Sequence, residues 1–124
     1  MGYRSEVGLC LSKKAIEYME TKCQEASVQL QDAVTRLFKD ADYAYEDKST
    51  GDKMWQWSWI KWYEMPFGYE EIQFVRNVML ELEEEDYLFV RVGEELDDLE
   101  SRGSYWENPF HLELDRSVLF SDAA

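Results

Sequence analysis

Residues 54–63 read MWQWSWIKWY, so four tryptophans and one tyrosine fall within ten positions. Neighbouring residues of a β-strand point to opposite faces of its sheet, and every second residue shares a face. The alternation in this stretch therefore predicts a strand with a row of tryptophans on one face. That row consists of Trp55, Trp57 and Trp59, and the opposite face carries Ile60 and Trp62.

The tryptophan row has two interpretations. Large aromatic side chains in strands usually pack into a core, and that interpretation is favoured. The alternative is an exposed recognition surface, because Trp and Tyr dominate the binding energy of many interfaces. Helices cover one face of a single sheet, so we expect at least one large ring on the uncovered face. Lys53 and Lys61 are the only cations within the strand, too few for a platform that binds single-stranded nucleic acid.

The flanking sequence completes an α+β pattern. Its periodicity predicts, in order, a strand at 3–11, a helical region at 13–40 with a break near Ala26–Ser27, a β-hairpin at 42–63, a helix at 69–85, a strand at 86–92 and, after a long acidic connection, a strand at 111–120. The order β-α-β-β-α-β-β favours one antiparallel or mixed sheet with the helices on a single face, close to a split βαβ arrangement. The 124 residues suit a single domain that spans 1–124.

The chain is strongly acidic, with 27 acidic and 13 basic residues and a net charge of −14. This charge disfavours direct binding to nucleic acid or to an anionic membrane, because both ligands need a positive potential. A basic protein surface is attracted to such a chain, so we expect a basic protein as the partner.

Residues 81–100 hold ten of the acidic residues and one base, Arg91, which gives this stretch a net charge of −9. One interpretation is a solvated face that only keeps the protein in solution. The other is a docking surface for a basic groove, in which carboxylates imitate the phosphates of a nucleic acid. Because the cluster flanks one predicted strand, the sheet could gather it at one end.

The sequence contains no recognisable motif for catalysis or metal binding. It has one histidine, His111, and no Ser or Cys in a known nucleophile motif. It also lacks a glycine-rich phosphate loop, a zinc spacing and a calcium loop. A carboxylate pair could serve glycoside hydrolysis, but among 27 acidic residues such pairs arise by chance. We therefore predict a protein that is not an enzyme and that holds no cofactor and no metal.

No apolar run resembles a signal peptide or a membrane span, so we expect a cytoplasmic location and no membrane partner. Cys10 falls in a predicted strand and Cys23 in a predicted helix. Thiols stay reduced in the cytoplasm, and both cysteines are interpreted as small core residues.

Three stretches stand out together: MGYRSEV at 1–7, WIKWYE at 59–64, and FVRVGEELDDLE at 89–100, which is soon followed by Arg102–Gly103. In combination they resemble small accessory proteins that are encoded by bacteriophages and prophages. The resemblance implies a phage or prophage context, and hence the cytoplasm of a host cell. Small acidic phage proteins often inhibit host machinery, including CRISPR effectors and restriction enzymes, and by that analogy we expect an anti-defence (anti-CRISPR-like) role.

The leading hypothesis is an acidic phage-type inhibitor that binds a basic, nucleic-acid-handling host protein. The predicted partner-binding residues are Trp62, Tyr63, Glu64, Glu94, Glu95, Asp97, Asp98 and Glu100. Arg91 and Gly93 are interpreted as structural, because Arg91 can pair with its acidic neighbours and Gly93 can allow a turn. The alternative hypothesis is a homo-oligomeric structural or virion-associated domain, for example a homodimer, that pairs through an aromatic sheet face.

Overall fold

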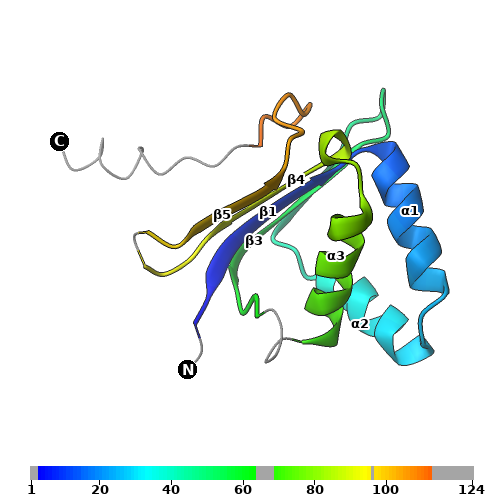
Figure 1. Ribbon diagram of the computed structural model, residues 1–124, viewed down its shortest axis with the longest axis horizontal. Helices are drawn as coiled ribbons and strands as arrows, with labels where there is room; N and C mark the ends of the chain where they lie inside the picture. The colour runs from blue at the N-terminus through cyan, green and yellow to red at the C-terminus, as the bar shows by residue number, and fades with distance from the viewer. Residues whose placement is uncertain (1–2, 64–68, 96, 113–124) are drawn as a thin grey trace.

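The computed structural model describes residues 3–63, 69–95 and 97–112 (Figure 1). Its elements are, in order, β1 (Ser5–Leu11), α1 (Lys13–Gln24), α2 (Val28–Lys39), β2 (Tyr43–Glu46), β3 (Lys53–Ile60), α3 (Glu70–Glu81), the short 3₁₀ turn η1 (Glu84–Asp86), β4 (Tyr87–Val92) and β5 (Leu99–Gly103). Within these residues the strands form one antiparallel sheet of order β2-β3-β1-β4-β5, and the helices lie together on one face of it. The predicted α+β class, with the helices on one side of a single sheet, is confirmed.

β1 is the first strand along the chain and the central strand of the sheet. It pairs antiparallel with β3 on one side and with β4 on the other. Both faces of β1 are covered, so Val7, Leu9, Cys10 and Leu11 are almost completely buried. Burial on both faces explains why the residues of β1 after Glu6 are all apolar and do not alternate between apolar and polar side chains.

The helices that follow β1 each begin at a serine. The Ser12 hydroxyl accepts a hydrogen bond from the backbone N–H of Ala15, and the Ser27 hydroxyl accepts one from that of Leu30. These caps satisfy backbone donors that have no partner inside the first turn of a helix. The break that was predicted near Ala26–Ser27 is confirmed, because α1 ends and α2 begins on either side of it.

The main core lies between the helices and the sheet. It draws on α1, α2 and α3 and on the three central strands, and its buried members are Val7, Leu9, Leu11, Ala15, Ile16, Met19, Leu37, Trp57, Trp62, Ile72, Val75, Val78, Met79, Tyr87 and Phe89. The Trp57 indole N–H donates to the backbone carbonyl of Leu37 at 3.0 Å. The Trp57 ring is therefore buried with its polar atom satisfied.

A β-bulge decides which of the tryptophans are buried. Ser5 pairs with Ile60 but Val7 pairs with Trp57, so β3 has one more residue than β1 between these two pairs. The bulge moves Trp59 out of the row, and its side chain is 60% exposed, whereas Trp57 is 2% exposed. The core interpretation of the row is thus confirmed for Trp57 and wrong for Trp59.

Trp62 follows the end of β3 and does not continue its alternation. Its backbone N–H donates to the carbonyl of Ile60 at 3.1 Å, so the chain turns sharply there. The Trp62 ring enters the main core, with its centroid 5.8 Å from that of Trp57 and 5.4 Å from that of Phe89. The prediction that Trp62 lies opposite the tryptophan row was wrong, because it assumed a strand that continues without interruption to Tyr63.

The face of the sheet turned away from the helices, here called the far face, carries a smaller core. Cys10, Met54, Leu88 and Val90 are buried there beneath residues 104–112, the covering segment. The segment contributes Tyr105, Phe110 and Leu112 to this core. It lies so close to β1 that a Cβ atom on Gly8 would be 2.8 Å from Cδ1 of Leu112. Glycine at this position therefore allows the segment to approach the sheet.

Two polar residues hold the covering segment in place. The buried Asn108 side chain donates to the carbonyls of Tyr105 and Leu112 and accepts from the backbone N–H groups of Phe110 and Leu112. The Tyr105 hydroxyl donates to the buried carboxylate of Asp52, which also accepts from the Lys13 backbone N–H. The segment is thus fixed both internally and to the start of α1.

The C-terminal third of the described chain differs from the sequence-based prediction. β5 lies within the stretch that was predicted to be a long acidic connection. Its residues, LESRG, lack an apolar alternation, and the strand forms through its ladder with β4. The predicted strand at 111–120 is not formed at His111, whose φ is 57°, or at Leu112. Residues 113–120 of that prediction lie outside the described residues.

Candidate partner-binding surface

The antiparallel pairing brings two distant parts of the chain to the same end of the sheet. β3 and β4 both run opposite to β1, so their last residues flank its first residues. Trp62 and Tyr63, which follow β3, and the turn between β4 and β5 therefore lie at one end. The carboxylates of 81–86 precede β4 and lie at its other end, about 20 Å away for a strand of this length. The expectation that one end of the sheet gathers the whole acidic cluster was wrong.

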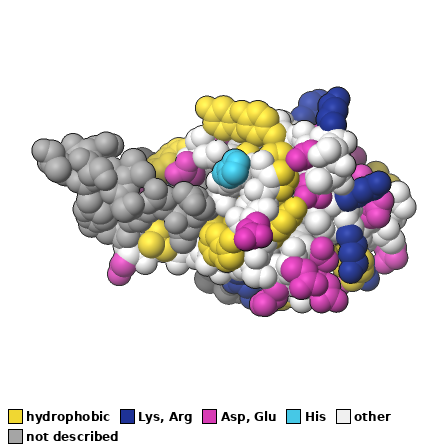
Figure 2. Space-filling view, turned by 90° about the horizontal axis from the view of Figure 1, so that it is seen from above, with side chains coloured by type: hydrophobic (Ala, Val, Ile, Leu, Met, Phe, Trp, Pro, Cys, Tyr) yellow, Lys and Arg dark blue, Asp and Glu magenta, His cyan; other side chains and the backbone are white. Residues whose placement is uncertain are grey.

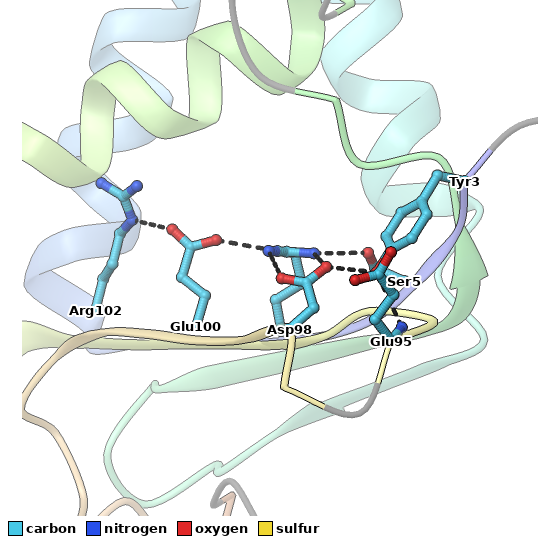
Figure 3. Close-up of polar contacts among 7 residues, drawn as sticks. Tyr3, Ser5, Glu95, Asp98, Glu100 and Arg102 are labelled. Carbon is cyan, nitrogen blue, oxygen red and sulfur yellow. Dashed lines mark hydrogen bonds and ion pairs between the residues drawn. The ribbon is translucent and has the colours of Figure 1, made fainter.

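An arginine-centred network orders the turn after β4 (Figure 3). The Arg91 guanidinium donates to both oxygens of Asp98, at 2.7 and 3.1 Å, and to Glu100 at 3.0 Å. It also donates to the Ser5 hydroxyl at 3.0 Å. The second oxygen of Glu100 accepts from Arg102 at 2.6 Å. Arg91 thereby ties β1, the turn and β5 together, and the bidentate geometry with Asp98 fixes their orientation.

The network shifts the pKa values of Arg91 and Glu100 in the directions that favour the charged form of each. Burial alone would lower the pKa of Arg91, but its hydrogen bonds to Asp98 and Glu100 raise the pKa above the ordinary value. Burial would raise the pKa of Glu100, but the bonds from Arg91 and Arg102 lower it below the ordinary glutamate value. Both groups therefore stay charged across the neutral pH range, and the network persists there.

Tyr3 and Gly93 complete this turn. The Tyr3 hydroxyl donates to Asp98 at 2.6 Å and accepts from the Glu95 backbone N–H at 3.1 Å. The hydrogen bond to Asp98 raises the pKa of Tyr3. A Cβ atom on Gly93 would lie 2.0 Å from an Asp98 carboxylate oxygen and 2.4 Å from the Tyr3 hydroxyl. Glycine at this position leaves room for the close approach of two side chains, and its φ is not positive.

The structure divides the predicted acidic residues into two groups. Asp98 and Glu100 point to Arg91 and form part of the network. Glu94, Glu95 and Asp97 are exposed at the turn, and we call these three residues the acidic tip. The backbone N–H of Arg4 donates to the Glu94 carboxylate, which links the tip to the start of β1. The tip is therefore the part of the predicted set whose side chains reach solvent.

The predicted aromatic residues are less accessible than the tip. Trp62 is 5% exposed, and its ring belongs to the main core. Tyr63 is half-buried and stacks on Tyr69, with ring centroids 6.0 Å apart and planes inclined by 13°. Glu64 lies outside the described residues. Trp62 is therefore a core residue that a partner cannot reach directly, and Tyr63 contributes one partly accessible ring.

Sequence reasoning missed a groove of about 390 Å³ on the helix side of the same end of the sheet. Its lining combines exposed rings with charges of both signs and includes Trp59, Tyr69, Arg4, Arg36, Lys61, Asp40, Asp42 and Glu71. Trp59 reaches the groove because of the bulge in β3, and a bulge cannot be recognised from a single sequence. Tyr69 was interpreted only as the start of a helix. The mixture of charges favours no single ligand class.

The part of the chain that the structure describes holds no group of three or more His, Cys, Asp or Glu side chains placed to bind a metal ion. None of its helices is both long enough and apolar enough to cross a membrane. Comparison with protein-family models, with curated proteins and with solved structures finds no match to this chain.

Proposed function

We propose that this protein is a non-enzymatic interaction protein of phage type that inhibits a basic, nucleic-acid-handling host protein. The partner's lysines and arginines, which otherwise contact phosphates, bind the acidic tip instead. A CRISPR effector or a restriction enzyme has the required chemistry. The single observation that carries the proposal is the exposure of Glu94, Glu95 and Asp97 beside Asp98, which Arg91 holds by two hydrogen bonds.

Pre-organisation is the physical advantage of this arrangement. A flexible acidic loop loses conformational entropy when it binds, and this loss weakens affinity. Here Arg91 and Tyr3 hold the Asp98 carboxylate, and the Tyr3 hydroxyl accepts from the Glu95 backbone N–H, before any partner arrives. The net charge of −14 adds long-range attraction to a basic surface, which raises the association rate and makes it dependent on salt.

The test compares two sets of charge reversals of equal size. One variant carries Glu94→Lys, Glu95→Lys and Asp97→Lys at the tip. The matched control carries Glu83→Lys, Glu84→Lys and Glu85→Lys, three exposed residues beyond the other end of β4. Each set changes the net charge by the same amount, so a difference between them reports position. Circular dichroism first checks that both variants fold.

Partners are captured from host lysate on the tagged protein, and the dissociation constant of the recovered partner is then measured at several salt concentrations. We expect the tip variant to weaken binding about 100-fold and the control by less than tenfold. The partner should also release its nucleic acid when this protein binds. Equal effects of both sets, or no effect of either, would overturn the proposal.

A second candidate function is a homo-oligomeric structural or virion-associated domain. It is favoured by Tyr43 and Tyr45, which are exposed on the far face. Hydrophobic side chains remain exposed on the side of the molecule that carries the covering segment, beside groups of acidic ones (Figure 2). Sedimentation at high protein concentration tests this candidate, and a strictly monomeric species counts against it.

A further inference from the structure

The outer edge of β2 offers main-chain hydrogen-bonding groups to another strand. Within the part of the chain that the structure describes, β2 is the first strand in the sheet order and pairs with β3 on one side only, and all four of its residues are exposed. The Asp47 backbone N–H donates to the carbonyl of Asp52 at 2.9 Å. Antiparallel ladders alternate, so Tyr45 and Tyr43 also bond inward to β3, and the N–H and C=O groups of Ala44 and Glu46 face outward.

Two tyrosine rings lie beside this edge on the far face. Tyr43 and Tyr45 pair with Gln56 and Met54 across the ladder, and their rings are 51% and 54% exposed. The rings are almost parallel, inclined by 7°, with centroids 6.5 Å apart. A cationic side chain from an added strand would lie against these rings, where cation–π attraction operates within about 6 Å.

The negative charge around this edge favours an incoming strand with positively charged side chains. Residues 40–52 contain five acidic residues and one base, Lys48. Glu46 is exposed on the helix side of the strand, opposite Lys53 in the ladder. A second copy of β2 would bring like charges together, which disfavours pairing between identical edges. A basic segment would instead find a carboxylate on one face and tyrosine rings on the other.

We propose that the β2 edge accepts an extended, basic segment of the partner protein as a sixth strand of the sheet. Its backbone bonds to Ala44 and Glu46, and alternate lysines or arginines lie along Tyr43 and Tyr45. This inference rests on the proposed function in one respect, the basic character of the partner. It uses a different surface, because β2 and β5 are opposite edges of the sheet, about 19 Å apart for four strand spacings.

The probe is a synthetic octapeptide of alternating lysine and valine, with an alternating glutamate and valine peptide as its control. Ala44→Pro removes the outward N–H, and because that group takes no part in the β2–β3 ladder, the hairpin tolerates the substitution. A second variant, Tyr43→Ser with Tyr45→Ser, removes the rings and leaves the edge hydrogen bonds intact. Hydrogen exchange of the Ala44 and Glu46 amides reports pairing directly.

We expect the lysine peptide to bind and to slow exchange at both amides, and the glutamate peptide to do neither. Ala44→Pro should weaken peptide binding at least tenfold, and the tyrosine variant about fivefold. The tip reversals of Glu94, Glu95 and Asp97 should change it less than threefold, so failure of the tip and failure of the edge are distinguishable. The inference is overturned if the peptide leaves hydrogen exchange at Ala44 and Glu46 unchanged, or if Ala44→Pro binds the peptide with full affinity. It is also overturned if these amides become protected without peptide as the protein concentration rises, because the occupant of the edge would then be a second copy of the chain.

Discussion

The two faces of the sheet are built in different ways. Three helices cover one face, and the large rings of Trp57, Trp62 and Phe89 pack together there. Among the described residues, the far face has four buried apolar side chains, and hydrogen bonds of Asn108 and Tyr105 hold the covering segment over them. Regions with few buried apolar contacts open more easily than the whole molecule unfolds. The helix side therefore sets global stability, and the far face can open locally.

Adjacent residues of β4 give the largest contrast between the two faces. Phe89 lies in the main core and Leu88 in the far-face core, and both are 0% exposed. Phe89→Ala should reduce the free energy of unfolding by about 3–5 kcal/mol, because it leaves a cavity among the rings. Leu88→Ala should cost less, about 2–3 kcal/mol, because the covering segment can settle into the space. Urea titrations measure both values, and an equal or larger loss at Leu88 would break the comparison.

A substitution of Arg91 tests how much its ion pairs stabilise the edge of the sheet that β4 and β5 form. Arg91→Met keeps much of the side-chain volume but leaves Asp98 without its bidentate partner and Glu100 without one of its two cations. We expect a loss of about 2 kcal/mol in unfolding free energy, since these carboxylates are only partly buried. Arg102→Met, which leaves Arg91 and Asp98 paired, is the control and should cost less.

The pH dependence of unfolding gives a second test of the Arg91 network. The folded-state pKa of Glu100 is lowered from 4.5, so this residue stabilises the folded state above that pH, and its contribution is lost as the pH falls through the lowered value. The stability difference between the native protein and Arg91→Met should therefore shrink as the pH drops below 4.5. A difference that stays constant down to strongly acidic pH would show that Arg91 acts through packing alone.

The smallest expected effect concerns the covering segment. Tyr105→Phe removes the hydrogen bond to Asp52 and should favour local opening by about 1 kcal/mol. Burial, with a smaller contribution from Asp52, raises the pKa of the Cys10 thiol to about 12, so Cys10 reacts at neutral pH only when the segment opens. The variant should raise the alkylation rate of Cys10 about fivefold, as measured by mass spectrometry. Cys23 on the partly exposed side of α1 is the internal control, and a parallel rise there would point to global unfolding instead.

The sequence predicted the parts of the fold that depend on local periodicity. The spacing of Ile72, Val75, Val78, Met79 and Leu82 indicated α3; the first four are buried as expected, whereas Leu82 follows the last residue of the helix and is only partly buried. β5 escaped prediction because its polar residues are held by pairing with β4 and by Arg91, which are contacts between strands and not preferences of residues 99–103 themselves. Local propensity carries no information about such contacts.

The candidate site was predictable only in composition. The sequence located the carboxylates after β4, but the reach of Arg91 decides that Asp98 turns inward and that Asp97 faces solvent. In the same way, the bulge between Trp57 and Ile60 decides which rings are exposed. Both are properties of strand register, which depends on pairing across the sheet and not on the residues of one strand.

The central position of β1 has a consequence for how the protein is made. This strand is synthesised before its two partners, which begin at residues 53 and 87. The sheet cannot close until β4 has been synthesised, which takes several seconds at roughly 5–20 residues per second. Until then the ring of Trp62, which follows β3, lacks its contact with Phe89 of β4, and folds rich in such long-range pairings form slowly. Residues 1–80 carry 13 acidic and 10 basic residues, so 11 of the 14 net negative charges, whose repulsion keeps neighbouring copies apart, are added only from residue 81 onward.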